Sequence, residues 1–234
     1  HIKADGTIDA DWHPMVMGGL VRTIAVNNGT VYVAGDFTNI GGENRAGLAA
    51  IGTDGDVTDW DPNPSGGTVS AIAFWHTDVI VGGAFTNITG ASTAQPYLAM
   101  LDATSAALRP WAENPDQPVS ALAVNVDTIY AAGEFQNIGA QQRRRLAAFN
   151  ATATGADAGK PTAWDPGADS SVYQLAYANN TIYIAGSFAT VGQASAEREL
   201  VAAIDATSGN VKDWHPAIAP VTNISVTTLA ASAD

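Results

Sequence analysis

Acidic side chains that could bind a cation gather at two places in the 234-residue sequence. Hard oxygen ligands at alternating positions suit Ca²⁺, so Asp54, Asp56 and Asp59 are candidate calcium ligands. The Asp-Gly pair in the same stretch is also a common hairpin turn, which is the alternative interpretation. We expect no cofactor unless calcium is bound there. The two stretches are TDGDVTDWDP, with Asp54, Asp56, Asp59 and Asp61, and KADGTIDADW, with Asp5, Asp9 and Asp11.

Carboxylates at one recurring position offer another chemistry. Asp36 and Glu134 follow the glycine of a repeated motif, and a pair of acids could cleave a glycosidic bond. Ala84 and Ser187 hold the same position in the other copies of the motif, and such variation is typical of a solvated rim. We therefore predict no catalytic residue here.

The four histidines give no catalytic or metal-binding pattern. No two of them have the spacing of a zinc site, and no GxSxG, GxxxxGK or HExxH motif occurs. His13 and His215 follow a recurring tryptophan at a position that is otherwise Asp61 or Asp165, which suggests a turn-capping role.

Residues that break the repeating pattern are the candidate partner contacts, because the conserved pattern positions are needed for packing. Trp75, Tyr97, Arg144 and Arg145 are such residues, and the links Thr89–Tyr97 and Ala151–Trp164 also depart from the pattern. The alternative is that these links are neutral length variations in solvent. The partner predicted for such contacts is a protein or a glycan.

Charge and composition narrow the class of protein. A net charge of −13 repels phosphate backbones, so we expect no nucleic-acid partner. Cysteine is absent, which excludes disulfides and thiolate sites. Gly, Asp, Asn or Thr interrupts every apolar run, so we expect no membrane insertion. With 46% hydrophobic residues the chain should fold as a globular body.

Four repeats must position these residues. The stretch VYVAGDFTNIGG returns as VIVGGAFTNITG, IYAAGEFQNIGA and IYIAGSFATVGQ, and the repeats start at Val21, Val69, Val119 and Val172. Each repeat holds short segments rich in Val, Ile, Tyr and Ala, separated by turn signals such as Asn-Gly and Asp-Gly. The starts lie 48, 50 and 53 residues apart, a spacing typical of propellers or solenoids.

The repeats predict an all-β fold, a β-propeller segment with four complete four-stranded blades of about 50 residues. The blades cover residues 21–68, 69–118, 119–171 and 172–221 of a single propeller, with part-blades at 1–20 and 222–234. Because both ends match incomplete repeats, we expect a segment of a longer chain with neighbouring domains.

Glycine, phenylalanine and tryptophan recur at fixed positions and are expected to be structural. The glycine should lie at a tight bend, the phenylalanine should plug the space between blades, and the tryptophan should fill the gap near the rim. These residues are Gly35, Phe37, Trp60, Gly83, Phe85, Trp111, Gly133, Phe135, Trp164, Gly186, Phe188 and Trp214.

The motifs G-[DAES]-F, R-x-x-LAA and D-x-x-x-G-x-V-x-x-W-x-P resemble those of the delta-60-repeat β-propellers of bacterial secreted and surface proteins. Similar units occur in the fungal cortical polarity marker. Gln95 is a departure, since Arg45, Arg143 and Arg198 hold its position elsewhere. The resemblance implies a non-enzymatic binding or structural module that is extracellular or at the cell surface.

A weaker resemblance leaves an enzyme as the alternative. The stretch from Leu200 to Trp214 is similar to the tryptophan-docking repeat of pyrroloquinoline quinone dehydrogenases, although the adjacent cysteine pair of that family is impossible here. The alternative function is therefore a propeller enzyme, either quinone-dependent and dehydrogenase-like or glycan-cleaving.

Overall fold

The computed structural model describes residues 2–88, 94–111, 113–214, 216 and 225–231. They form short antiparallel strands joined by turns and loops, and the one helical element among them is the 3₁₀ turn η1, Gly155–Asp157. The all-β prediction is therefore confirmed. The described part contains no helix long and apolar enough to span a membrane. The chain forms two compact units, residues 1–109 and 110–234, which are described separately below.

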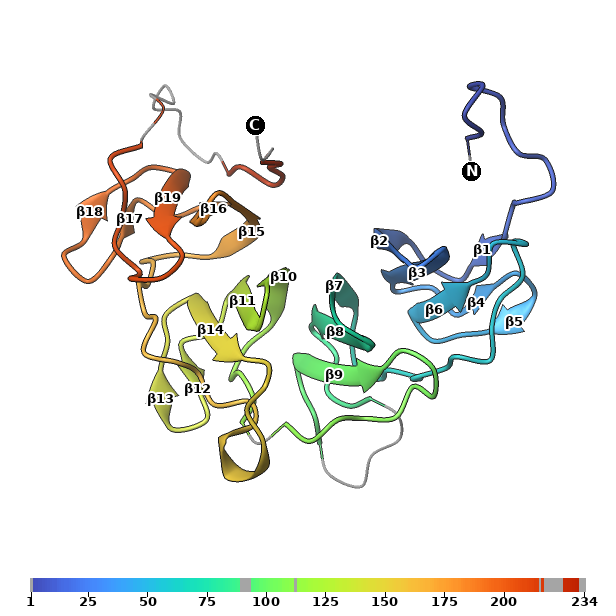
Figure 1. Ribbon diagram of the computed structural model, residues 1–234, viewed down its shortest axis with the longest axis horizontal. Coiled ribbons are helices and arrows are strands. Elements are labelled where there is room, and N and C mark those ends of the chain that lie inside the picture. Colours follow the sequence, from blue (N-terminus) through green and yellow to red (C-terminus); the bar gives the residue numbers. More distant parts are fainter. Residues whose placement is uncertain (1, 89–93, 112, 215, 217–224, 232–234) are drawn as a thin grey trace. The chain divides into compact units, whose positions relative to one another are not determined.

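Each predicted repeat contributes one three-stranded antiparallel sheet in which the second strand is central (Figure 1). In the first unit these sheets are β2 (Val21–Asn27), β3 (Thr30–Gly35) and β6 (Leu48–Ile51), then β7 (Val69–Trp75), β8 (Asp78–Gly83) and β9 (Leu98–Asp102). In the second they are β10 (Val119–Asn125), β11 (Thr128–Gly133) and β14 (Leu146–Asn150), then β15 (Val172–Ala178), β16 (Thr181–Gly186) and β19 (Val201–Asp205).

The fourth strand expected in each repeat does not form, which corrects the prediction of four-stranded blades. In each repeat it is reduced to one isolated bridge to the third strand, as in Ile51 with Val57 and Ile204 with Val211. The physical reason is that the chain then leaves its own sheet, because the tryptophan that follows packs on the next repeat. The sheets are therefore three-stranded, with a single-bridge fourth segment.

Two-residue strands form a second layer of pairing that the sequence pattern did not predict. The hairpins are β4 (Asn39–Ile40) with β5 (Glu43–Asn44), β12 (Asn137–Ile138) with β13 (Gln141–Gln142), and β17 (Thr190–Val191) with β18 (Ala196–Glu197). β1 (Val16–Met17) pairs with β4, and bridges from Ser65, Pro115 and Ala168 reach the equivalent segments. The chain after Trp12, Trp60, Trp111 and Trp164 thus belongs structurally to the following repeat.

The recurring glycines occupy a close approach between two strands. A Cβ at Gly35, Gly83, Gly133 or Gly186 would lie 1.9–2.2 Å from the carbonyl oxygen of the residue just before the first strand. The pairing register shifts by one residue next to each of these contacts, for example between Val69 and Ala71 opposite Gly83. The predicted tight bend is therefore a β-bulge at which a side chain cannot fit.

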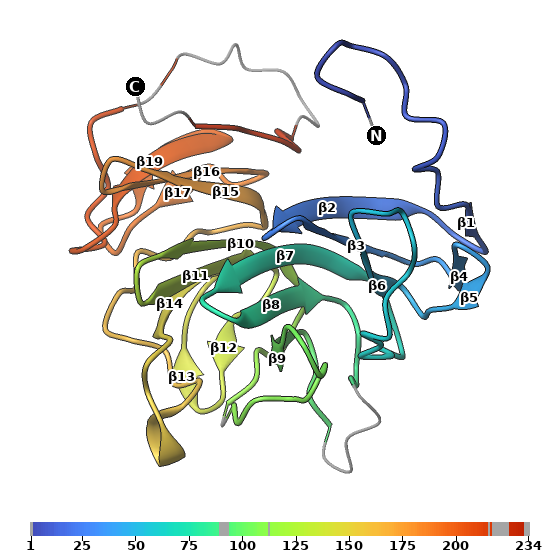
Figure 2. The same ribbon diagram turned by 45° about the vertical axis from the view of Figure 1, so that its right-hand side comes forward.

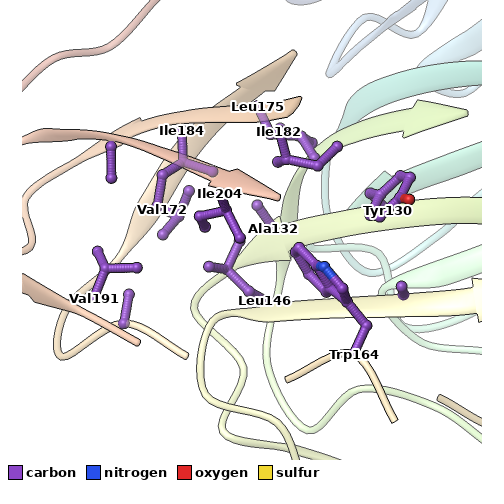
Figure 3. Packing of buried hydrophobic residues seen from close by; sticks show 14 of the residues in the cluster. Tyr130, Ala132, Leu146, Trp164, Val172, Leu175, Ile182, Ile184, Val191 and Ile204 are labelled. Atoms are coloured by element: carbon purple, nitrogen blue, oxygen red, sulfur yellow. The ribbon is translucent and has the colours of Figure 1, made fainter. Parts of the chain in front are cut away.

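The core lies between successive sheets of each unit. In unit 1, β7 lies against β2 and β3 (Figure 2), and Tyr32 and Ala34 of β3 share a cluster with Val79 and Val81 of β8. Unit 2 repeats this arrangement between β11 and β16 (Figure 3). Because strand side chains alternate, one set of side chains on β3 faces the following repeat of unit 1, and one set on β16 faces the preceding repeat of unit 2.

The recurring phenylalanines are buried in this core. Phe37, Phe85, Phe135 and Phe188 are each at most 1% exposed. The four phenylalanines are therefore core residues, and their role as plugs between blades stays a prediction.

Candidate functional site

The recurring tryptophan packs on the next repeat, at the end of the third strand. We call this receiving place on the next repeat the socket. The indole Nε1 of Trp60 donates a hydrogen bond to the carbonyl oxygen of Asp102 at 2.9 Å, and that of Trp164 to Asp205 at 3.1 Å. Trp12 makes the same bond to Gly52 at 3.2 Å. Trp60 and Trp164 are 3% and 6% exposed. The tryptophan thus joins successive repeats through a directed bond as well as through apolar contact.

An aspartate at the end of the third strand shapes the socket. Asp102 Oδ1 accepts bonds from the amides of Thr104 and Ser105 at 2.9 and 2.7 Å, which closes a tight turn. Asp205 closes the equivalent turn with Thr207 and Ser208 at 3.1 and 2.8 Å. The Ser105 amide, followed by the Ser105 hydroxyl and the Thr104 amide, holds the pKa of Asp102 below its usual value.

A tyrosine on the central strand completes the socket, and sequence reasoning missed it. The hydroxyls of Tyr32 and Tyr130 donate to the carbonyl oxygens of Ala103 and Ala206 at 3.4 and 2.9 Å. Each ring meets the tryptophan of its own repeat edge-on, at 5.1 Å for Tyr32 and 5.2 Å for Tyr130. Burial raises the pKa of Tyr130. The available signal was the tyrosine repeated in VYVAG, IYAAG and IYIAG.

The recurring arginine holds the segment that carries the tryptophan. Arg45 Nη2 donates to the carbonyl of Thr58 at 2.8 Å, two residues before Trp60. Arg143 and Arg198 bind Thr162 and Lys212 in the same way at 2.5 and 3.2 Å. These bonds fix the direction in which the chain leaves its sheet, so the arginine has a structural role.

The second repeat has no arginine at this position and uses different residues. Gln95 occupies the arginine position, is 5% exposed, and donates to the carbonyl of Leu98 at 2.9 Å. Arg109, two residues before Trp111, instead bonds Asp78 at 2.8 Å and Asp102 at 2.6 Å. The departure at Gln95 is thus accompanied by a local ion-pair network.

The calcium candidates do not form a ligand cage in the structure. Asp54 Oδ1 accepts a bond from the amide of Asp56 at 3.1 Å, which is a turn-closing contact. Asp54, Asp56 and Asp59 are exposed, and no three acidic or histidine side chains among the described residues lie close enough to hold a metal ion. Calcium binding therefore stays a prediction from sequence.

The acids considered for glycan cleavage have separate surroundings. Asp36 accepts bonds from the Leu20 amide at 2.6 Å and from Arg22 at 2.9 Å. The Leu20 amide and the Arg22 side chain, in that order, lower the pKa of Asp36. Glu134 belongs to the other unit, and its side chain is exposed. Asp36 thus acts locally to tie the start of β2 to the end of β3.

The four candidate contact residues differ in their roles. Tyr97 and Arg145 have left-handed backbones, with φ of 67° and 68°, at the position that Gly47 and Leu200 hold in other repeats. The amides of Tyr97 and Arg145 bond the carbonyls of Phe85 and Phe135 at 3.0 and 2.8 Å. Arg144 is exposed. Trp75 ends β7, and its ring lies edge-on 4.8 Å from that of His76.

The long link of the third repeat changes its socket. Trp111 lies 5.2 Å from Phe149, but its buried Nε1 has no hydrogen-bond acceptor within the described part of the chain. Gly159, with φ of 77°, packs so closely on the Trp111 indole that a Cβ there would lie 2.6 Å from Cδ1. The inserted loop thus covers the Trp111 indole, and the Nε1 bond of the other sockets is missing among the described residues. Most of the other departing link, Thr89–Tyr97, lies outside the described residues.

These sheets and sockets define an all-β protein that is built from repeats. A family model described as "Domain of unknown function (DUF5122) beta-propeller" matches residues 27–57, which run from the end of β2 to the bridge at Val57. The match supports a β-propeller repeat family and a β-propeller-like domain of unknown function. A search of the curated proteins found no match.

Two solved structures are similar to this chain. The crystal structure of the computationally designed Ika4 protein has a TM-score of 0.48 and 11% identity, over 79% of this chain and 89% of that one. The crystal structure of the computationally designed Ika8 protein has a TM-score of 0.47 and 14% identity, over 82% of this chain. The match spans 60% of the Ika8 chain.

Proposed function

We propose that this chain is a non-enzymatic binding or structural module of a secreted or cell-surface protein. The observation that carries the proposal is that the recurring residues have structural contacts: the glycine lies at a close approach within its sheet, the phenylalanine is buried in the core, and the tryptophan packs on the next repeat. Groups that recur in every repeat in this way build a scaffold. A scaffold of this kind can present loops without reshaping its sheets.

The finer assignment is that the repeats are of the delta-60 type. The four repeats are then complete blades of one propeller that spans residues 1–234, with neighbouring domains in a longer protein. The socket supports this assignment because its geometry recurs within both units, at Trp60 with Asp102 and at Trp164 with Asp205. A repeated interface of one kind is what radial packing of blades requires.

The partner is a protein or a glycan, and the residues proposed to contact it are the third-repeat link, 151–164, and Arg144. This link carries one exposed acid, Asp157 of the 3₁₀ turn, which pairs with Lys160 at 3.1 Å. Arg144 is exposed next to Gly167 and adds a second cation to this surface. Such mixed charge suits polar recognition.

The test uses an array of bacterial and host glycans with the intact chain and a loop-graft variant. In the variant, residues 150–160 are replaced by DATSGN, the turn of the fourth repeat at 205–210. We expect binding by the intact chain and its loss in the variant, with unchanged circular dichroism. Arg144→Ala should weaken binding, whereas Lys3→Ala, which lies in the other unit, should not.

The enzyme alternative is tested on the same preparation. Dye-linked oxidation of alcohols with added quinone, and release of nitrophenol from nitrophenyl glycosides, should both be absent. Glycoside turnover that disappears in Asp36→Asn or Glu134→Gln would contradict the proposal. Retained binding by the loop graft would move the contact away from the link.

A further inference from the structure

The indole of Trp111 is covered in a way that leaves its polar group unpaired. Its Nε1 atom is buried and has no hydrogen-bond acceptor among the described residues, whereas the Nε1 atoms of Trp60 and Trp164 each bond a carbonyl oxygen. A buried N–H that gives up water without gaining an acceptor destabilises the state in which it is buried. The cover over Trp111 therefore depends on packing and is opposed by the polarity of the group beneath it.

Gly159 provides this cover. A Cβ at Gly159 would lie 2.6, 2.7 and 2.8 Å from Cδ1, Nε1 and Cγ of Trp111. Gly209 lies beside Trp164 in the fourth repeat, and a Cβ there would lie at the ordinary contact distance of 3.4 Å from Cδ1. The backbone at Gly159 thus lies directly on the part of the indole that carries the donor, and a side chain does not fit there.

Residues 152–160, which we call the strap, form few polar contacts with the rest of unit 2. In the described part of the chain their hydrogen bonds close within the strap or on Asn150, where the strap begins. Lys160 and Asp157 form the internal ion pair at 3.1 Å. Ala158, next to Gly159, is 6% exposed. The strap is therefore held over Trp111 by the packing around Ala158 and can lift while it keeps its own bonds.

Lifting the strap would hydrate the Trp111 donor and leave the indole in place. The loss of packing at Gly159 would be offset in part by the hydrogen bond that Nε1 gains with water, so the open state is accessible from the closed one. The indole would stay anchored by Phe149, which is 0% exposed and lies 5.2 Å away between ring centroids. Opening thus creates a flat apolar face that carries one directed donor.

We propose that the strap opens and that the uncovered Trp111 indole binds a sugar ring of the glycan partner. This inference rests on the proposed function, in which the third-repeat link contacts that partner. The C–H face of a sugar ring complements the indole face, and its hydroxyl oxygens accept from Nε1. Trp60 and Trp164 cannot act in this way, because the Nε1 of each already bonds a carbonyl oxygen. The charges of Asp157 and Lys160 on the strap favour this polar ligand over an apolar segment of a protein.

Deuterium exchange of the indole Nε1 protons measures opening without any ligand. The six tryptophans give separate indole signals in the NMR spectrum of an isotope-labelled sample, and Trp111→Phe and Trp164→Phe assign the two that matter. We expect the Trp111 proton to exchange at least about tenfold faster than the Trp164 proton, because only Trp164 must break a hydrogen bond to exchange.

Gly159→Ala and Gly155→Ala form a matched pair that tests the strap. The two glycines have φ of 77° and 62°, so alanine is strained at both, but a Cβ at Gly155 would meet no heavy atom within 4 Å. Gly159→Ala alone drives the strap against the indole, so Trp111 should exchange at least about tenfold faster in it than in Gly155→Ala. Slow exchange at Trp164 in both variants shows that the unit is folded. Equal Trp111 exchange in the two variants overturns the proposal.

Sugar binding is tested with the methyl glycosides of glucose, galactose, mannose and N-acetylglucosamine, and with a proline-rich peptide as the protein alternative. We expect a glycoside to shift the Trp111 indole signal in a saturable way. By calorimetry its affinity should be at least about threefold higher for Gly159→Ala, because the apparent affinity rises with the open fraction. Trp111→Phe removes the donor and should weaken binding at least about tenfold.

The outcomes separate this inference from the proposed function. Glycan-array binding that is lost in the loop graft but unchanged in Trp111→Phe overturns the inference and leaves the proposed function standing. A complete absence of array binding overturns both. A shift of the Trp111 signal by the peptide and by none of the glycosides overturns the assignment of a sugar and favours a protein partner.

Discussion

At the scale of single residues, the strongest constraint is the missing Cβ at the recurring glycines. A Cβ at Gly83 would lie 2.1 Å from the carbonyl oxygen of Thr68 and 2.9 Å from the Cα of Val69, both backbone atoms that cannot rotate away. We expect Gly83→Ala to lower the free energy of unfolding by about 3 kcal/mol. Urea denaturation measures the loss.

Gly42 in the same unit is the matched control for this prediction. Its φ is +90°, but a Cβ there would meet no heavy atom within 4 Å. Gly42→Ala should therefore lower stability only by the backbone strain, about 1 kcal/mol. Equal losses in the two variants would show that backbone strain, rather than the close approach to Thr68, governs the glycine position.

Ionisation of Asp102 makes the free energy of unfolding depend on pH, and the lowered pKa gives the direction of the dependence. Its pKa is lowered in the folded state, first by the Ser105 amide, so the ionised carboxylate stabilises the fold. This contribution is complete above the unfolded-state pKa of about 3.9 and is lost as the pH falls through the folded-state pKa. Asp102→Asn keeps an acceptor oxygen, as Asn150 does in the third repeat with Thr152 at 3.0 Å, but removes the charge.

The urea midpoints of wild type and Asp102→Asn should accordingly differ at pH 7 and converge as the pH is lowered below about 4. Asp61→Asn is a suitable control, because it neutralises another acid outside the turn. A gap between wild type and Asp102→Asn that is constant with pH would contradict the ionic contribution.

At the scale of elements, the tryptophan-bearing segments differ in one bond. Trp164 donates to the Asp205 carbonyl at 3.1 Å, whereas the buried Nε1 of Trp111 finds no acceptor among the residues described. We expect Trp164→Phe to lower the free energy of unfolding by about 1–2 kcal/mol more than Trp111→Phe, since only Trp164→Phe removes a hydrogen bond. Thermal and urea unfolding measure both variants, which lie in the same unit.

The loop graft at 150–160 provides the complementary experiment for this element. If it restores an acceptor for Trp111, Trp111→Phe should become as damaging in the graft as Trp164→Phe is in the wild type. A Trp111→Phe loss that is the same with and without the graft would show that the inserted loop does not determine the missing bond.

The sequence predicted the long strands well, because several residues of alternating hydrophobicity mark them. It predicted the short strands poorly, because two residues show no alternation. Strand segments such as Val69–Trp75 and the buried phenylalanines follow from alternation and turn signals. Two-residue hairpins such as Asn39–Ile40 with Glu43–Asn44 have no period to detect. The reduced fourth strand was missed because a repeated tryptophan has the same spacing whether it packs on its own sheet or the next one.

The socket residues were only partly predictable for a related reason. Trp60 was assigned to packing, but its acceptor at Asp102 lies 42 residues away, and aligning repeats does not reveal contacts between repeats. Tyr32 escaped notice because Ile80 holds its position in the second repeat, so the tyrosine pattern is incomplete. The left-handed backbones at Tyr97 and Arg145 were hidden because only Gly47 announces them in sequence.

At the scale of the whole molecule, the net charge of −13 makes stability depend on salt. Raising the ionic strength from about 0.01 M to about 0.15 M shortens the screening length from about 30 Å to about 8 Å, which weakens self-repulsion. We expect the Tm in NaCl to rise by a few degrees over this range. Calorimetry measures the shift, and a Tm that falls with salt would show that attractive ion pairs dominate.

Divalent ions at matched ionic strength separate screening from binding. The calcium hypothesis for Asp54, Asp56 and Asp59 predicts that Ca²⁺ raises the Tm above the value in Mg²⁺ and that Asp54→Asn with Asp56→Asn removes the difference. Equal Tm values in the two ions would contradict the hypothesis.

The forward docking of each tryptophan also bears on how such a gene can change length. The sequence unit that a duplication copies and the structural unit that packs do not begin and end at the same residues. The reason is that the tryptophan at the end of one sequence repeat packs in the next repeat, as Trp60 does at Asp102. An unequal crossover between equivalent codons of repeats that keep this bond therefore leaves a donor and an acceptor at the new junction. Repeats can be gained or lost without a new interface having to arise, and loops such as 150–160 can diverge in one copy alone.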